Sequence, residues 1–310
     1  MKPEHIAVCT TTFYPKWQPG ETHIGQLLES GDRALAEGKI RGDLALETAQ
    51  AVLRKGYNLI LVDGAKDSAF QAELARLGIP FEQEAARGMS ASRRQAFDKA
   101  YSDPDVQAVA WIEPEKVGMV DEIERCAAPI LSGEAAIVVP GRTERGWNSL
   151  PTYQRDSERE GNRVFNDKLQ RSGLLPEADE LDVYFGPRVY SARQEYRGQL
   201  LDILHRRYSF AKKDTVPLHA VVNPGAYSEA TFFPPIAALN EGLAVKSVPT
   251  NFAYPEQQRE LEEHAAFAEG PNGYRTKRKA QLVGILTELV NYLRSVGKLG
   301  KGDSRLERLI

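Results

Sequence analysis

The segment NLILVDG at residues 58–64 combines an unbroken apolar run with an acid and a glycine at its end. An apolar run of this length, closed by a turn signal, is typical of a strand buried on both faces of a parallel sheet. Similar runs occupy residues 5–12 (HIAVCTTT), 106–112 (VQAVAWI) and 135–140 (AAIVVP). Amphipathic stretches such as 41–56 separate them. This alternation predicts β-α-β units, and therefore an α/β fold with a mostly parallel central sheet flanked by helices.

The same periodicities predict the other elements along the chain. The remaining predicted strands are 79–84, 183–190, 219–222 and 244–248, and the predicted helices are 41–56, 68–77, 90–100, 121–131, 158–170, 194–207, 232–241 and 276–296. The polar segment 141–173 is expected to begin as a loop and to cover a site.

Several of the predicted strands end in polar or turn residues. These ends are 10–13, Asp63 with Gly64, and 113–115. In open α/β sheets ligands bind beyond the carboxyl ends of the strands. We therefore expect the three segments to converge on one cleft, with Thr11 among the residues that bind the ligand.

Two acidic positions at these strand ends could carry chemistry. Asp63 can accept hydrogen bonds from a base or a ribose, or it can simply cap the turn that follows. Glu113 and Glu115 flank Pro114, and carboxylates held around such a turn can bind Mg²⁺ or Mn²⁺ together with substrate phosphates. The alternative for the pair is a solvated acidic loop that Lys116 neutralises.

The segment GMSASRRQ at residues 88–95 places a glycine and two arginines at the start of a predicted helix. Backbone N–H groups at a helix start and guanidinium groups both favour phosphate oxygens, which makes Gly88, Arg93 and Arg94 candidates for phosphate binding. Adjacent helical residues point about 100° apart, so only one of the two arginines is expected to face the ligand.

The order of these features resembles the GT-A glycosyltransferases, particularly the family 2 type. The resemblance rests on four segments of the first 140 residues: CTTTFYP (9–15), LILVDGAKDS (59–68), GMSASRRQAF (88–97) and WIEPEK (111–116). It implies that Asp63 contacts the nucleobase, and that Glu113 and Glu115 take the place of the paired aspartates that hold ribose and metal. The chain departs from the family pattern, because these acids are glutamates separated by a proline.

The resemblance implies a nucleotide-sugar transferase that moves a sugar to an acceptor hydroxyl, with Mg²⁺ or Mn²⁺ at Glu115. It also implies one GT-A domain, in which residues 1–140 bind the nucleotide-sugar and residues 141–310 form the acceptor side. If the reaction inverts, a carboxylate takes the acceptor proton, and Asp182 and Glu229 are the candidates for this base. His219, at the start of a predicted strand, is a candidate metal or phosphate ligand, with a structural histidine as the alternative.

Two other functions fit the same layout. One is a catalytically silent protein that binds a nucleotide-sugar, which the altered acidic motif permits. The other is a sugar-phosphate nucleotidyltransferase, although such enzymes usually carry a glycine-rich, arginine-containing loop soon after the first strand, where this chain has TTFYPKWQP (11–19).

The resemblance implies a nucleotide-sugar donor and a small-molecule or glycan acceptor as partners. The net charge of −3 argues against a nucleic-acid partner, and the sequence leaves a homo-oligomer open. Cys9 and Cys126 are too few for a disulfide framework, which favours a reducing compartment. No window is apolar for the length of a membrane span, so we expect a cytoplasmic protein.

Overall fold

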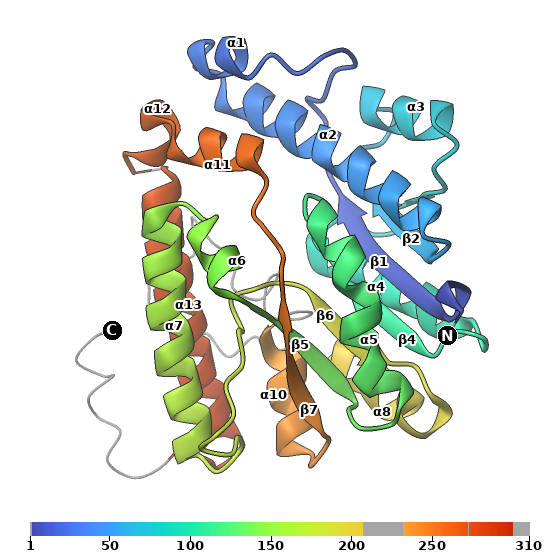
Figure 1. Cartoon of the computed structure of the whole chain (residues 1–310), viewed down its shortest axis with the longest axis vertical. Coiled ribbons are helices and arrows are strands. Elements are labelled where there is room, and N and C mark those ends of the chain that lie inside the picture. The colour runs from blue at the N-terminus through green and yellow to red at the C-terminus, as the bar shows by residue number, and fades with distance from the viewer. Residues whose placement is uncertain (1, 207–231, 272, 300–310) are drawn as a thin grey trace.

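A computed structural model describes residues 2–206, 232–271 and 273–299 of the chain. Within these residues seven strands form one sheet in the order β3-β2-β1-β4-β6-β5-β7 (Figure 1). The strands are β1 (Ile6–Thr12), β2 (Asn58–Asp63), β3 (Glu82–Gln83), β4 (Ala108–Trp111), β5 (Ile137–Arg142), β6 (Arg188–Ser191) and β7 (Val245–Thr250).

The register of the parallel strands aligns their carboxyl ends. In β1, Thr12 pairs with Asp63 of β2, and Cys9 pairs with Trp111 of β4. Strand β6 runs antiparallel to both of its neighbours, β4 and β5, whereas β5 and β7 are parallel. The sheet is therefore mixed but mostly parallel, as predicted.

Helices cover both faces of the sheet (Figure 1). They are α1 (Ile24–Glu29), α2 (Arg33–Arg54), α3 (Ala69–Arg76), α4 (Met89–Ser102), α5 (Ile123–Leu131), α6 (Glu144–Asn148), α7 (Thr152–Arg171), α8 (Gln194–His205), α10 (Phe233–Asn240), α11 (Glu256–Glu263), α12 (Ala265–Ala268) and α13 (Tyr274–Ser295), with 3₁₀ turns η1 (Pro3–His5) and η2 (Val117–Glu122).

Alternating residues of β1 divide the core between the two faces. Ile6 and Val8 pack against α2, α3 and α5, whereas Ala7 and Cys9 face α4 and the larger core that includes α7, α8, α10 and α13. The two longest helices of the second half, α7 and α13, lie side by side (Figure 1). Strands β1, β2, β4 and β5 are thus buried on both faces, which is why they read as continuous apolar runs, whereas the edge strands β3 and β7 are largely exposed.

Some predicted elements differ from the observed ones. Helix α2 begins at Arg33, eight residues before the predicted start of that helix, because Asp32 caps it by accepting a hydrogen bond from Leu35 N. Strand β6 begins only at Arg188, because Gly186 and Pro187 precede it and break the predicted strand 183–190. The predicted strand 219–222 lies outside the described residues.

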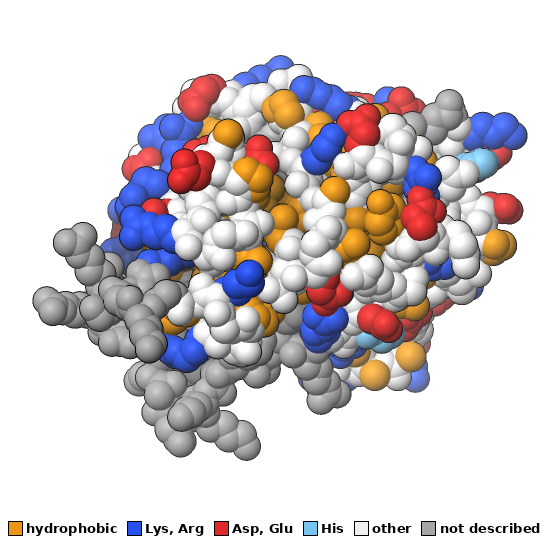
Figure 2. Space-filling model, turned by 90° about the horizontal axis from the view of Figure 1, so that it is seen from below, with side chains coloured by type: hydrophobic (Ala, Val, Ile, Leu, Met, Phe, Trp, Pro, Cys, Tyr) orange, Lys and Arg blue, Asp and Glu red, His pale blue; other side chains and the backbone are white. Residues whose placement is uncertain are grey.

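Acidic and basic side chains are interspersed on the face seen in Figure 2, around a central band of hydrophobic ones. On that face the described residues therefore create no large field of one sign. No helix in the described part of the chain is long and apolar enough to cross a membrane. Both cysteines, Cys9 and Cys126, are buried free thiols.

Candidate functional site

A cavity of about 790 Å³ opens at the carboxyl ends of β1 and β4. Its wall includes Thr11 and Thr12 from β1 and residues 113–116, which follow β4. We call the part lined by the start of α4 the α4 side, and the part lined by residues from Arg142 onward the α7 side. A cavity of this volume suits a ligand the size of a nucleotide-sugar, since such ligand pockets span about 300–1,000 Å³.

The cavity brings together five of the predicted site residues: Thr11, Gly88, Arg93, Glu113 and Glu115 all lie on its wall. Asp63, Arg94 and Asp182 lie elsewhere. His219 and Glu229 fall outside the described residues. Of the two adjacent arginines, Arg93 lines the cavity and Arg94 does not.

Asp63 is fully buried at the end of β2, and its carboxylate serves the protein itself. Its Oδ1 accepts a hydrogen bond from the Thr12 hydroxyl at 2.6 Å, and its Oδ2 accepts from Ala65 N at 3.0 Å and from the Gln71 amide at 2.8 Å. Burial raises the pKa of this carboxyl. In this geometry Asp63 shapes the turn, and Gly64 occupies the cavity wall.

The first turn of α4 forms one wall of the α4 side. Gly88 precedes the helix with φ 125°, a conformation that favours glycine, and no side chain caps the helix. Ala91 N and Ser92 N donate to Gly88 O, which leaves the N–H groups of Met89 and Ser90 to an anion, and the helix dipole favours negative charge at the same place. The Arg93 guanidinium lies 4.9 Å from the centre of the Trp111 ring.

Glu113 lies against a glycine, which determines where its carboxylate can sit. A Cβ added at Gly186 would overlap Glu113 Oε1, so only a glycine lets the carboxylate approach. Lys116 Nζ is 3.9 Å from Oε1. Glu113 Oε2 is buried and has no hydrogen-bond partner in the described part of the chain. An unpaired buried carboxylate oxygen is costly, and a cation on the cavity side would satisfy it.

Glu115 is held by an aromatic hydroxyl. Tyr14 Oη donates a hydrogen bond to Glu115 Oε1 at 2.9 Å. Burial and the Glu115 charge raise the pKa of Tyr14 well above its ordinary value, so the phenol stays protonated and keeps donating. This leaves the second carboxylate oxygen of Glu115 for a ligand. Among the described residues no group of three or more His, Cys, Asp or Glu forms a metal site, so a cation would need substrate oxygens as further ligands.

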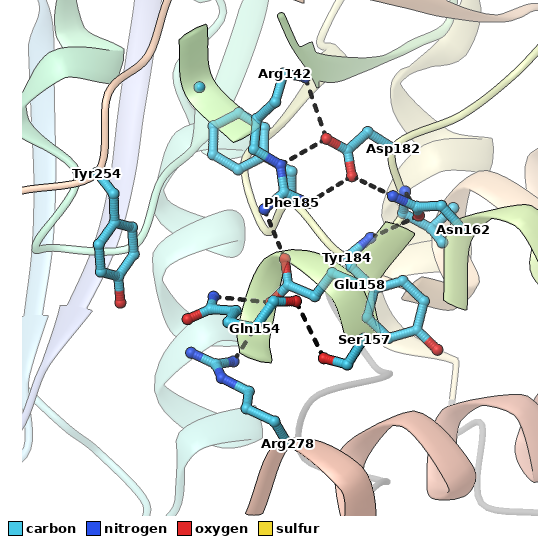
Figure 3. Close-up of polar contacts among 12 residues, drawn as sticks. Arg142, Gln154, Ser157, Glu158, Asn162, Asp182, Tyr184, Phe185, Tyr254 and Arg278 are labelled. Carbon is cyan, nitrogen blue, oxygen red and sulfur yellow. Dashed lines mark hydrogen bonds and ion pairs between the residues drawn. The ribbon is translucent and has the colours of Figure 1, made fainter. Parts of the chain in front are cut away.

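A buried ionic network forms the wall of the α7 side (Figure 3). Arg142 donates to Asp182 from Nε at 2.7 Å and from Nη2 at 2.7 Å, and from Nη1 to Glu158 at 2.6 Å. The Asn162 amide donates to Asp182 Oδ1 at 2.7 Å. Asp182 thus sits behind Arg142, with Arg142 between it and the cavity, which gives it a positioning role in this geometry.

A second carboxylate, Glu262 of α11, organises the neighbouring wall. It is fully buried and accepts hydrogen bonds from Arg41 at 3.0 Å, Tyr254 at 2.8 Å and Gln258 at 3.1 Å. Arg278 of α13 lies 3.8 Å from its other oxygen. Residues more than 200 positions apart in the sequence, such as Arg41 and Glu262, meet here.

Several lining residues were not expected from the sequence. Glu84 accepts a hydrogen bond from the Ser92 hydroxyl at 2.8 Å and lies against Gly64, and Arg142 ends β5. Glu84 ends the predicted strand 79–84 and Arg142 follows the predicted strand 135–140, so the rule on strand ends could have found both. Glu158 and Arg278 lie on helices and carried no such signal. Phe13, within the strand end 10–13 that was expected at the cleft, is 63% exposed and also lines the cavity.

No protein-family model matches the sequence, and no curated protein matches it. The seven-stranded, mostly parallel sheet with helices on both faces is nevertheless the GT-A fold of nucleotide-sugar transferases. The resemblance expected from the sequence is therefore confirmed at the level of the fold.

Solved structures of that fold resemble the chain. Glucosyl-3-phosphoglycerate synthase from Mycobacterium tuberculosis, in complex with phosphoglyceric acid, aligns with a TM-score of 0.50 and 11% identity over 96% of this chain and 81% of the synthase. The same synthase in complex with Mn²⁺, UDP-glucose and phosphoglyceric acid aligns with a TM-score of 0.48 and 10% identity, again over 96% of this chain and 81% of the synthase. A protein from Desulfovibrio desulfuricans G20, described as a nucleotide-diphospho-sugar transferase, gives 0.44 and 10% over 92% of this chain and 98% of its own.

Proposed function

We propose that this chain is a glycosyltransferase that moves a sugar from a nucleoside diphosphate to an acceptor hydroxyl. The observation that carries the proposal is the meeting of Glu113, Glu115 and Arg93 in one cavity at the carboxyl ends of the strands of a GT-A fold. We expect residues 1–140 to bind the donor on the α4 side and residues 141–310 to bind the acceptor on the α7 side, where the described lining residues run from Arg142 to Gln281.

In the proposed reaction a bond forms between the acceptor oxygen and the anomeric carbon. The bond from that carbon to the phosphate oxygen breaks, and the nucleoside diphosphate leaves with the electron pair. The Arg93 guanidinium and the N–H groups of Met89 and Ser90 in the first turn of α4 would stabilise the charge on the departing phosphates. The acceptor proton goes to a base, for which Glu229, outside the described residues, stays a prediction.

The residues present fit a divalent cation. Glu113 Oε2 has no partner in the described part of the chain, and Tyr14 occupies only one oxygen of Glu115. Mg²⁺ and Mn²⁺ commonly take one or two protein carboxylates and complete their shell with water and phosphate oxygens. A bound cation would neutralise charge on the diphosphate. We propose Glu113 and Glu115 as its protein ligands.

The second function that an observation favours is nucleotide-sugar binding without turnover. Glu115 is already engaged by Tyr14, and the described acids supply at most two carboxylates at this place. Weak cation binding would leave a protein that recognises the donor but does not cleave it.

Thermal unfolding with UDP-, GDP- and ADP-sugars, with and without Mn²⁺, tests the binding step, because a ligand that prefers the folded state raises the melting temperature. Release of the nucleoside diphosphate in the same mixtures tests turnover. We expect both for one donor in the presence of Mn²⁺. Binding without release would favour the silent alternative, and the absence of both would reject a nucleotide-sugar protein.

A variant links the cation to Glu113. Glu113→Gln removes the charge but keeps the size, so we expect at least tenfold weaker Mn²⁺-dependent donor binding. Glu122→Gln, in the 3₁₀ turn that follows, is the matched control, since Glu122 pairs with Arg125 away from the cavity. Equal donor binding by the two variants would remove Glu113 from the cation site.

A further inference from the structure

We infer that the acceptor is a neutral, polyhydroxylated molecule such as a sugar or a glycan end, bound on the α7 side of the cavity. The inference rests on the proposed function for the assignment of the donor and acceptor sides. It comes from two features of this wall: its arginines are already neutralised by buried carboxylates, and glutamines from three helices line the same space.

The positive charge of Arg142 is neutralised by two acids. Asp182 accepts hydrogen bonds from two side-chain N–H groups and the backbone N–H of Arg142, and Glu158 accepts from a third side-chain N–H. The guanidinium side chain is 2% exposed. An incoming anion would meet two carboxylates within hydrogen-bond distance of this cation, and their charges cancel most of its attraction. Arg142 can therefore donate a hydrogen bond but offers little net charge.

Arg278 and Arg41 follow the same pattern. Arg278 lies 3.7 Å from Glu158 and 3.8 Å from Glu262, and Arg41 lies 3.0 Å from Glu262. Arg142 and Arg278 of the α7 side, and Arg41, which reaches this side through Glu262, are thus paired with Asp182, Glu158 and Glu262. Lys116, whose ammonium lies near the rings of Phe185 and Phe252, is in turn 3.9 Å from Glu113. A phosphate or carboxylate would displace one of these pairs and leave a buried acid unpaired, which is strongly unfavourable.

Glutamine amides supply the groups that a hydroxyl-rich ligand needs. Gln154 of α7, Gln258 of α11 and Gln281 of α13 all line the cavity. An amide offers two donors and an acceptor, which match a hydroxyl that both donates and accepts. Gln258 already donates to Glu262 at 3.1 Å and Gln281 accepts from Arg278 at 3.0 Å, so only the remaining groups of these two amides serve a ligand. Gln154 Oε1 is buried with no partner among the described residues, although its amide nitrogen donates to Glu158 at 2.8 Å. This oxygen can accept a hydrogen bond from a ligand hydroxyl.

An aromatic ring completes the complementarity to a sugar. Tyr184 lines the same side and packs edge-on against Phe232, with 5.7 Å between ring centres. Its hydroxyl is buried and has no partner within the described residues. A sugar ring has apolar C–H faces beside its hydroxyls, so a wall that combines ring surface with unpaired polar atoms binds both parts.

The experiment uses the whole chain and measures binding at the two sides separately. The shift in melting temperature with UDP or GDP and Mg²⁺ measures nucleotide binding at the donor side. Saturation-transfer NMR in the same buffer then tests neutral disaccharides (maltose, cellobiose, lactose), phosphoglyceric acid and inorganic phosphate. We expect transfer to at least one disaccharide and none to the two anions. Transfer to phosphoglyceric acid or phosphate alone would overturn the inference, as would no transfer at all from a protein that binds nucleotide.

Two neighbouring glutamines on α11 provide a matched pair of variants. Gln258 is buried and lines the cavity, whereas Gln257 is exposed. Gln258→Ala should weaken disaccharide binding about tenfold, the effect of about one lost hydrogen bond, and Gln257→Ala should leave it unchanged. Equal binding by the two variants would overturn the inference. If neither nucleotide produces a shift, the proposed function fails instead, and the two failures stay distinguishable.

Glu158→Gln provides a test in which the variant is expected to gain binding of an anion rather than to lose binding of a sugar. This change removes the carboxylate that both Arg142 and Arg278 approach, and so leaves net positive charge on the α7 side. We expect the variant to gain binding of phosphoglyceric acid by at least tenfold over the unchanged protein. A folded Glu158→Gln variant that gains no anion binding would show that charge compensation does not control acceptor choice.

Discussion

Asp182 holds Arg142 through both carboxylate oxygens, with the Nε and Nη2 atoms of the arginine each 2.7 Å from the acid. The backbone N–H of Arg142 adds a third hydrogen bond at 3.1 Å. Arg142 also stacks over Trp147, with its guanidinium 3.8 Å from the ring centre. These contacts fix the end of β5, and with it one wall of the cavity.

Asp182→Asn should lower the free energy of unfolding by about 3 kcal/mol, because breaking a buried ion pair leaves a charge without its partner. Urea unfolding at pH 7 measures this. Glu160→Gln is the control, since Glu160 pairs with Arg163 at the surface, where such a pair contributes about 1 kcal/mol or less. Similar losses in the two variants would contradict the structural importance of the Asp182–Arg142 pair.

The same pair predicts a dependence of stability on pH. Burial pushes the pKa of Asp182 upward, but the Arg142 charge and the hydrogen bonds outweigh burial and hold the pKa below its ordinary value. A carboxyl with a lowered pKa in the folded state stabilises the protein above its unfolded pKa of about 4, and this stabilisation is lost as the pH falls below that value. Between about pH 6 and pH 2, the free energy of unfolding should therefore fall more steeply with decreasing pH for the unchanged protein than for Asp182→Asn. Parallel curves would contradict the lowered pKa.

Gly186→Ala should impair Mn²⁺-dependent donor binding, because the new methyl group would displace the Glu113 carboxylate. Gly198→Ala is the control: Gly198 is exposed on α8 with no atom near its absent Cβ, so alanine should stabilise the helix by about 0.5–1 kcal/mol. Thermal shift with and without Mn²⁺ compares the two. Normal Mn²⁺-dependent binding by a folded Gly186→Ala protein would show that the position of Glu113 is unimportant.

Arg93→Met should weaken binding of a nucleoside diphosphate by about tenfold or more, since a hydrogen bond to a charged group contributes about 1.5–3 kcal/mol. Arg94→Met should change it little, because Arg94 lies off the cavity wall. Isothermal titration with UDP or GDP and Mg²⁺ measures both. A larger loss at Arg94 than at Arg93 would reverse the assignment of the phosphate-binding arginine.

Much of the fold could be predicted because local pattern and tertiary packing agree in the first half of the chain. Strand β2 occupies the residues predicted for it, and α3 and α5 lie within one or two residues of their predicted ends. The short helices α1, α11 and α12 were not predicted. They are too short to show a clear periodicity, and α11 and α12 pack on a small separate core with α2 and α13.

The lining residues that the sequence predicted lie at strand ends or, for Gly88 and Arg93, at a helix start. Glu113, Glu115 and Thr11 follow the strand rule, and the structure brings them to one cavity. Asp63 follows the same rule, but its two oxygens are used by Thr12, Ala65 and Gln71. A strand end shows that a residue lies near the ligand edge. It does not show which way the side chain points or what already binds it.

The sequence by itself determined the α/β class, the positions of the main strands along the chain and the location of the ligand edge, because periodicity and strand-end chemistry are local properties. Only the tertiary structure decided that Asp182 faces Arg142 and that Arg41 meets Glu262. These contacts join residues far apart in the chain, and no local pattern encodes them. The charge balance of the α7 side, and with it the proposed class of acceptor, depends on such long-range pairs.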